Sequence, residues 1–232
     1  ENVWSNVGTG SANISPVPPS SHAQGSISAY QSGGTSGSNI ITKFAFASVS
    51  TFADVGNLTA GRYMPAGSSS STHGYTTGGY SSTSVIDKFT FSSDANATSV
   101  GSLNSGAYVC SGGESTTHGY TCGGVSSNVI QKHSFSVDGN ATDVGDLTLS
   151  RRTAGTASSS THGFTLGGNV PSTDNIDRFS FSSDGNATDF GSLSSASGQK
   201  PSATNSMDYG YASGGLTSFN TIEKFAFATG GS

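Results

Sequence analysis

Charged residues are scarce in this chain of 232 residues. They make up 10% of the sequence, with 14 acidic against 9 basic residues, and no basic run exceeds the pair Arg151-Arg152. A protein that binds the phosphate backbone of a nucleic acid needs a clustered positive surface. The net charge of −5 and the missing basic cluster therefore argue against a nucleic-acid partner.

Long hydrophobic runs are also missing. No apolar stretch approaches the roughly 18 residues of a membrane span, so we expect no membrane insertion. The chain begins at Glu1 with neither Met nor a signal peptide, and we expect a processed product or an excised domain.

Hydrophobic residues account for only 32% of the chain, a value that by itself would suggest disorder. Disordered segments, however, usually combine high charge with few aromatic residues. This chain has 13 Phe, 8 Tyr and 33 Gly, which is typical of close-packed strands and tight turns.

Only two cysteines are present, and they flank a predicted hairpin with its tip at His118-Gly119. With that tip, Cys110 and Cys122 are out of register by several residues, whereas a disulfide needs closely aligned Cβ atoms. We therefore expect two free thiols.

The chain is built from an internal repeat. An aromatic residue followed by Gly-Gly occurs five times, with first glycines at Gly33, Gly78, Gly123, Gly167 and Gly214, spaced by 45, 45, 44 and 47 residues. Each is followed by an apolar–x–basic–aromatic–x–Phe segment, at 41–46, 86–91, 130–135, 176–181 and 222–227, with His133 as the one non-Phe aromatic position. Four copies continue into Asp/Ser–x–Gly–x–Leu, at 54–58, 99–103, 143–147 and 189–193. Such a period is typical of propellers and other repeat architectures.

Within a repeat the hydrophobic pattern has period two, which predicts strands. In the second repeat we expect four of them, at about 62–71, 74–80, 85–92 and 97–103. Thr72-His73-Gly74 is predicted to be the turn between the first two strands, with glycine supplying a positive φ. The Gly-Gly pairs are predicted to end the second strand and to let neighbouring units approach closely.

These features predict an all-β, five-bladed β-propeller with four-stranded antiparallel blades in one domain, residues 1–232. The repeats are expected at about 20–58, 62–103, 107–147, 151–193 and 200–232. The last repeat lacks the Gly-x-Leu strand. Residues 1–9, which belong to no repeat, carry a similar signature in Asn6-Val7-Gly8. We expect residues 1–9 to supply the fourth strand of the last blade and so to close the ring.

The repeat resembles the kelch motif in its aromatic-x-x-Gly-Gly strand, its aromatic third strand and the arginines Arg62 and Arg151. It departs from that motif where Val100, Val144 and Phe190 replace the kelch Trp of the fourth strand, and its repeats are shorter. Segments such as IDRFSFSSDGNATDFGSL, residues 176–193, also look like repeat proteins encoded by marine bacteriophages, including those that infect cyanobacteria. This resemblance implies a virion or tail protein.

Several residue patterns invite a chemical interpretation. His73, His118 and His162 recur at one register, but equivalent positions on different blades are spread around a ring and do not converge on a metal. The repeated aspartates (Asp54, Asp143 and Asp189; Asp94, Asp138 and Asp184) fit turn caps better than a calcium site of converging oxygens. No serine or cysteine has an evident base. We predict no catalytic residue, no metal and no cofactor.

The informative residues are those that differ among the repeats. The loops after the second and fourth strands share one face of a propeller and diverge in sequence, and they carry Tyr and Arg, which are enriched at binding hot spots. The predicted partner-binding residues are Arg62, Tyr63, Tyr80, Tyr108, Arg151 and Arg152.

The leading hypothesis is a non-enzymatic structural and interaction module. It would be assembled in the bacterial cytoplasm and displayed on a phage particle, as a decoration or as an adhesion domain of a tail or fibre. Its partners would be other virion proteins or a host-surface receptor or glycan, which places it at the virion surface or outside the cell.

Two alternatives remain. A carbohydrate-binding, lectin-like propeller would be expected to repeat its aromatic contacts, yet Tyr80 is matched in the other repeats by Thr35, Val125, Asn169 and Leu216. An intracellular kelch adaptor for a peptide is less favoured, because such surfaces usually carry more charge.

Overall fold

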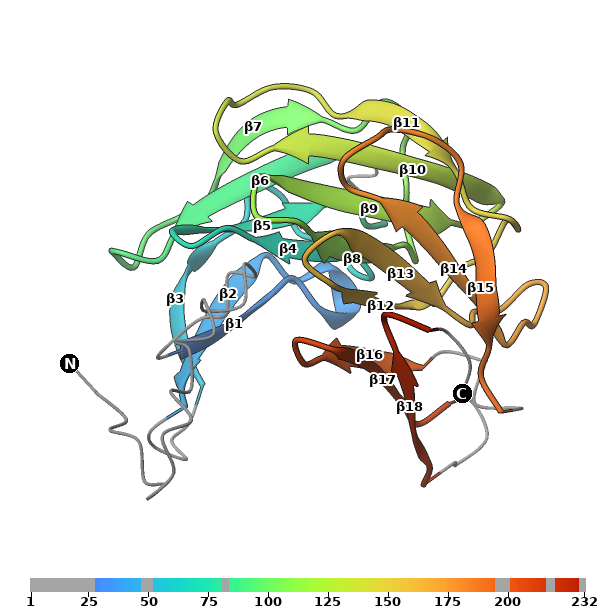
Figure 1. The fold of residues 1–232 in the computed structure, drawn as a ribbon. Helices are drawn as coiled ribbons and strands as arrows, with labels where there is room; N and C mark the ends of the chain where they lie inside the picture. The colour runs from blue at the N-terminus through green and yellow to red at the C-terminus, as the bar shows by residue number, and fades with distance from the viewer. Residues whose placement is uncertain (1–27, 47–51, 81–83, 195–200, 216–219, 230–232) are drawn as a thin grey trace, which may run out of the picture.

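The computed structural model describes residues 28–46, 52–80, 84–194, 201–215 and 220–229. These residues form five small antiparallel sheets that follow one another around a centre, as Figure 1 shows from blue to red. The predicted five-bladed, all-β propeller is confirmed. The predicted closing segment, residues 1–9, lies outside the described residues.

The sheets are named blades 1 to 5 in chain order. Blade 1 contains β1 (Ser28–Ser32), β2 (Ile40–Ala45) and β3 (Ala53–Asn57), with a short 3-10 turn, η1 (Thr35–Gly37), between its first two strands. Blade 2 contains β4 (Ala66–Ser69), β5 (His73–Thr77), β6 (Val85–Thr90) and β7 (Thr98–Ser102). Blade 3 contains β8 (Ser111–Glu114), β9 (His118–Gly124), β10 (Ser127–Ser134) and β11 (Thr142–Asp146). Blade 4 contains β12 (Gly155–Ser158), β13 (His162–Leu166), β14 (Asn175–Ser180) and β15 (Thr188–Ser192), and blade 5 contains β16 (Ser202–Asn205), β17 (Tyr209–Ser213) and β18 (Ile222–Ala226).

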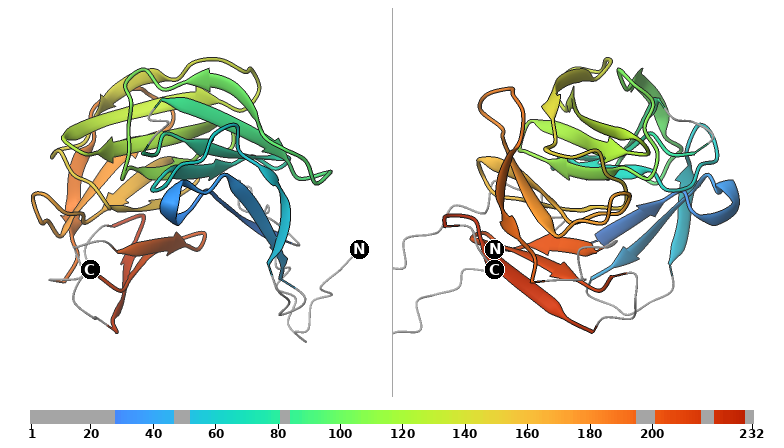
Figure 2. Two further views of the ribbon diagram at one scale, coloured as in Figure 1. Left: turned by 180° about the vertical axis from the view of Figure 1, so that it is seen from behind. Right: turned by 90° about the vertical axis from the view of Figure 1, so that its right-hand side faces the viewer.

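Blades 2, 3 and 4 have the predicted four strands, and each sheet falls within one predicted repeat. Among the described residues, blade 1 begins at the second strand of the repeat and blade 5 ends at the third. The first strands β4, β8, β12 and β16 contact one another in turn, so they surround the centre while the later strands lie farther out (Figure 2).

Aromatic side chains join neighbouring blades. Tyr75 of β5 stacks on Phe135 of blade 3, with ring centroids 4.9 Å apart and an interplanar angle of 25°. The same stack recurs in the pairs Tyr30–Phe91, Tyr120–Phe181 and Phe164–Phe227. Offset aromatic pairs at these distances contribute beyond the area they bury. The repeated aromatic positions therefore form the core between blades rather than within one.

The Thr-His-Gly turns differ from the prediction. His73 and Gly74 are the first residues of β5, not the turn, and Gly74 has no positive φ. A Cβ at Gly74 would instead overlap the ring of Phe89 on the adjacent strand, and Gly163 and Gly210 have the same relationship to Phe179 and Phe225. Glycine is needed here to seat an aromatic ring.

The Gly-Gly pairs behave as predicted. Gly78 has a φ of 63°, and a Cβ on it would overlap the carbonyl oxygen of Ala107 in the next blade. The Gly79 N–H donates to that same carbonyl at 2.9 Å. The pair therefore ends the second strand and bonds it to the following blade.

The Asp/Ser–x–Gly signature marks a β-bulge in the fourth strand. In blade 1 the register shifts so that Ile41 lies opposite Gly56 while Thr42 lies opposite Asp54. The Asp54 carboxylate accepts the Gly56 N–H at 3.2 Å, so it caps this bulge within β3 rather than the predicted turn. Asp143 and Asp189 do the same for Gly145 and Gly191.

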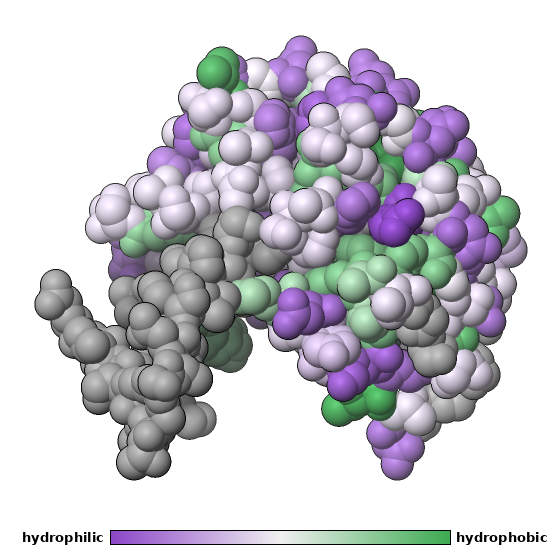
Figure 3. All heavy atoms as spheres, in the orientation of Figure 1, coloured by the Kyte–Doolittle hydropathy of each residue, from purple (hydrophilic) through white to green (hydrophobic). Residues whose placement is uncertain are grey.

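One face of the molecule is predominantly polar in its described residues. On the face shown in Figure 3, hydrophilic and weakly polar residues prevail, with hydrophobic areas between them. Within the described ranges, no helix has the length and apolar character required to span a membrane.

Candidate partner-binding face

Arg62 was predicted to bind a partner, and the structure contradicts this. Its side chain is fully buried, with one terminal nitrogen bonded to the buried Asp87 carboxylate and the other donating to the carbonyl oxygens of Gly78 and Val85, each at 3.2 Å. Burial lowers the pKa of Arg62, and Asp87 opposes that shift. Arg62 therefore ties strands of blade 2 together and is unavailable to a ligand.

Arg151 has the same role in blade 4, so this prediction is also wrong. It is 1% exposed, pairs with Asp177 and donates to the carbonyl oxygens of Gly167 and Asn175 at 3.1 and 3.0 Å. A comparison between repeats could have revealed the role, because blade 3 loses the arginine and the aspartate together. Ala107 and Gln131 stand in their places.

The structure brings the three predicted tyrosines together. Tyr80 lies beside Tyr63, with ring centroids 4.8 Å apart and an interplanar angle of 36°. On its other side, Tyr80 makes an edge contact with Tyr108 of blade 3 at 5.7 Å. Tyr80 is 47% exposed, while Tyr63 and Tyr108 are half-buried. Three aromatic rings thus form one continuous surface across two blades.

The hydroxyl groups of these tyrosines are not bonded to any other described part of the chain. Among the residues that the structure describes, none of the hydroxyls of Tyr63, Tyr80 and Tyr108 has a protein hydrogen-bond partner. An aromatic surface with free hydroxyls offers both apolar contact and directional hydrogen bonds.

The same backbone positions continue around the ring. The Tyr80 N–H donates to the Tyr63 carbonyl, and the equivalent bonds run from Val125 to Tyr108 and from Asn169 to Arg152. We call the six residues at these positions the tyrosine row: Tyr63, Tyr80, Tyr108, Val125, Arg152 and Asn169. The row passes from aromatic side chains on blades 2 and 3 to a half-buried arginine on blade 4.

The backbone next to the row is held in an unusual conformation. Met64, Val109 and Thr153 have φ values of 56°, 57° and 57°. Positive φ is unfavourable for branched residues such as Val and Thr. The Val109 N–H donates to Met64 at 3.1 Å and the Thr153 N–H donates to Val109 at 2.9 Å. These bonds connect three blades, so the row is displayed on a fixed backbone.

The three repeated histidines lie on separate strands. Thr72 and the Nδ1 atom of His73 are hydrogen-bonded at 2.8 Å, and His118 and His162 have the same threonine contact. Burial is the largest cause of the lowered pKa of each histidine. Within the described ranges, no group of three His, Cys, Asp or Glu side chains is arranged to hold a metal ion.

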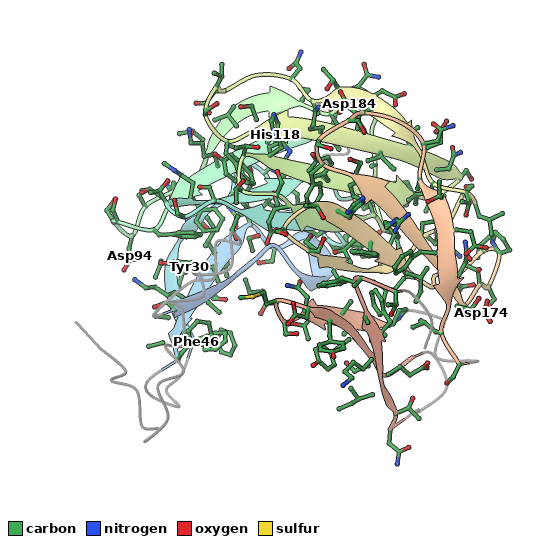
Figure 4. All side chains as sticks on the ribbon, viewed as in Figure 1. Tyr30, Phe46, Asp94, His118, Asp174 and Asp184 are labelled. Atoms are coloured by element: carbon green, nitrogen blue, oxygen red, sulfur yellow. The ribbon has the colours of Figure 1, made fainter. Side chains whose placement is uncertain are left out.

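A second set of aspartates bonds adjacent blades. Asp94 pairs with Lys43 at 3.1 Å, and the two equivalent pairs, Asp138–Lys88 and Asp184–Lys132, span 2.8 and 2.5 Å. Figure 4 shows Asp94 and Asp184 on turns toward the outside of the ring. The adjacent Asn96 accepts the N–H of Asn57 at 2.9 Å, and Asn140 and Asn186 repeat the contact. These turns therefore join blades.

Both cysteines are free, as predicted, although the predicted register is wrong. The residue opposite Cys122 is Ser111, which directly follows Cys110, whereas the predicted register separated the two cysteines by several residues. Cys110 packs against the core between blades 2 and 3, whereas Cys122 belongs to the core that includes Phe179 of blade 4. The thiols point to opposite sides of blade 3, and burial raises both pKa values to about 12.

No protein-family model and no curated protein matches this sequence. The likeness to kelch and phage repeats therefore stays a prediction from the motif residues. The functional argument depends on the tyrosine row itself.

Proposed function

We propose that this chain is a non-enzymatic adhesion module of a phage particle, which attaches to its partner through the tyrosine row. The observation that carries this proposal is the contact of Tyr80 with both Tyr63 and Tyr108 on the divergent face. As predicted from the sequence, the partner is another virion protein or a host-surface receptor or glycan.

Tyrosine suits such a surface for physical reasons. It provides a large, rigid contact area with only two side-chain torsions to fix, together with a polar group. The backbone beneath it is bonded from blade to blade, so little ordering is required on binding. A rigid ring that displays variable loops is the usual arrangement for a binding site.

The aromatic surface also bears on the lectin-like alternative. Tyr80 has no aromatic equivalent in the other repeats, which argues against one sugar site per blade. It does not argue against a single site, because all three rings meet at the junction of blades 2 and 3. A one-site lectin is therefore one form of the proposed adhesion function.

Attachment of the labelled protein to marine bacterial cells, cyanobacteria included, tests the proposal. We expect Tyr80→Ala with Tyr108→Ala to reduce attachment at least about tenfold, since hot-spot residues each contribute 1–2 kcal/mol or more. Val137→Ala is the control, because Val137 is 69% exposed and lies after β10, on the opposite face. Equal attachment by the double variant and the control would overturn the proposal.

A further inference from the structure

We propose that the tyrosine row binds an acidic oligosaccharide, with sugar rings on the tyrosines and a carboxylate or sulfate on Arg152. This inference rests on the proposed function and specifies the ligand of the same row. Two independent observations carry it: the state of Arg152 and the chemistry of the three tyrosines.

Arg152 differs from every other described cation of the chain. Two arginines are buried with aspartates, and three lysines pair with aspartates of the next blade. The last two described cations, Arg178 and Lys224, lie over the rings of Phe190 and Tyr209 at 4.6 and 4.4 Å. Among the residues described, Arg152 alone has neither an acidic nor an aromatic partner.

An unpaired arginine on a binding face favours an anionic ligand. Its planar fork of N–H groups matches a carboxylate or a sulfate with two parallel hydrogen bonds. The Arg152 backbone is already fixed by two bonds with Asn169, at 3.1 and 2.8 Å. The backbone that carries this side chain is thus fixed at one end of the row, and the guanidinium has no acidic partner among the described residues.

The aromatic part of the row favours a sugar ring. A pyranose presents C–H groups on its face and hydroxyls at its edge, which complement a tyrosine ring and its free hydroxyl. The row itself carries no acidic residue that would repel an acidic glycan. The tyrosines at one end of the row thus complement a sugar ring, and the arginine at the other end complements its acidic group.

The ligand must be longer than one sugar. Tyr108 and Arg152 occupy equivalent positions on neighbouring blades, and Val125 lies between them in the row. A single sugar ring in contact with Tyr80 of blade 2 does not reach Arg152 of blade 4. A short acidic chain along the row can contact both the tyrosines and the arginine.

Calorimetric titration with two probes tests the inference: a hexamer of galacturonic acid and a neutral maltohexaose. We expect the acidic hexamer to bind more tightly, and Arg152→Gln to weaken it about tenfold while leaving any neutral binding unchanged. Arg152→Lys should restore part of the loss. Tyr80→Ala should weaken the binding of both probes, whereas Lys88→Gln, on β6 and paired with Asp138 of an outer turn, should change neither.

The outcomes separate this inference from the proposed function. If both hexamers bind equally and Arg152→Gln leaves their affinities unchanged, the proposal of an acidic ligand is wrong. Failure of both hexamers to bind, while the tyrosine variants still abolish attachment to cells, would overturn the glycan and leave the adhesion function standing. If the tyrosine variants attach normally, the adhesion function fails and the inference fails with it.

Discussion

Arg62 and Asp87 form a fully buried ion pair, in which the guanidinium also donates to two carbonyl oxygens of blade 2. The carboxylate in turn accepts the N–H and the hydroxyl of Thr59 at 2.9 and 2.7 Å. All charged groups of the pair are thus satisfied in the core. Blade 3 lacks both residues, and there Gln131 bonds the N–H and carbonyl of Ser105 at 3.0 and 2.9 Å. One chain therefore contains two solutions to the same packing problem.

The first prediction uses these two solutions. Arg62→Ala should lower the free energy of unfolding by about 3–5 kcal/mol, because it leaves Asp87 buried without its cation. Adding Asp87→Gln reproduces the blade 3 combination and should recover most of that loss. Urea denaturation of the two variants measures the difference. A double variant as unstable as Arg62→Ala would show that the blade 3 arrangement does not transfer.

The second prediction concerns His133, which occupies the position of Phe89 and Phe179. Its side chain is 3% exposed, neither ring nitrogen has a hydrogen-bond partner among the described residues, and burial lowers its pKa to about 4. His133→Phe should raise the free energy of unfolding at pH 7.5 by about 1 kcal/mol, since it removes an unsatisfied buried group.

The gain should grow in acid. Between pH 6.5 and 4 the unfolded chain protonates His133 while the folded chain does not, so wild-type stability falls as pH falls through this window. At pH 4.5 the advantage of His133→Phe should therefore exceed its value at pH 7.5 by about 2 kcal/mol. Thermal unfolding at both pH values checks this, with Phe179→His as the converse variant. A pH-independent gain would contradict the argument.

The third prediction concerns the glycine that seats an aromatic ring. Gly74→Ala should destabilise the protein by about 1–3 kcal/mol, because the new methyl group meets the Phe89 ring in a packed core. Gly139→Ala is the matched control, because no atom lies within 4 Å of a Cβ there and Gly139 has no positive φ. Differential scanning calorimetry compares the two. Similar melting temperatures for both variants would show that the Phe89 ring moves aside without cost.

The sequence was sufficient for the fold because the repeat displays it five times. Period-two strands, Gly-Gly pairs and a constant spacing report backbone geometry, which is local. The site was harder to predict, because Arg62 and Tyr63 are neighbours in sequence, yet Arg62 is fully buried and Tyr63 is partly exposed. Residue type alone predicts that both bind a partner. Only the three-dimensional packing distinguishes the arginine of the buried ion pair from the tyrosine of the tyrosine row.

The repeated isoleucine of the third strand is exposed in blade 5, unlike in the other four blades. Ile222 of β18 is 75% exposed, whereas its equivalents Ile41, Ile86, Ile130 and Ile176 are at most 1% exposed. In blades 1 to 4 this isoleucine shares a buried core with the leucine that follows the fourth strand. Ile176 and Leu193 are one such pair. The edge of β18 thus has the hydrophobic position that a fourth strand covers.

The last prediction is that residues 1–9 cover this position. From an alignment on the bulge of the other blades, we expect Gly8 to lie opposite Ile222 and Trp4 to take the place that buried alanines such as Ala141 and Ala187 hold. Deleting residues 1–9 should therefore lower the melting temperature by several degrees, about 1 kcal/mol or more. Trp4 is the only tryptophan, so its fluorescence reports the docking directly. We expect blue-shifted emission that Ile222→Asp moves to the red. A deletion that shifts melting by only a degree or two, or emission typical of exposed tryptophan in the intact chain, would contradict ring closure by this segment.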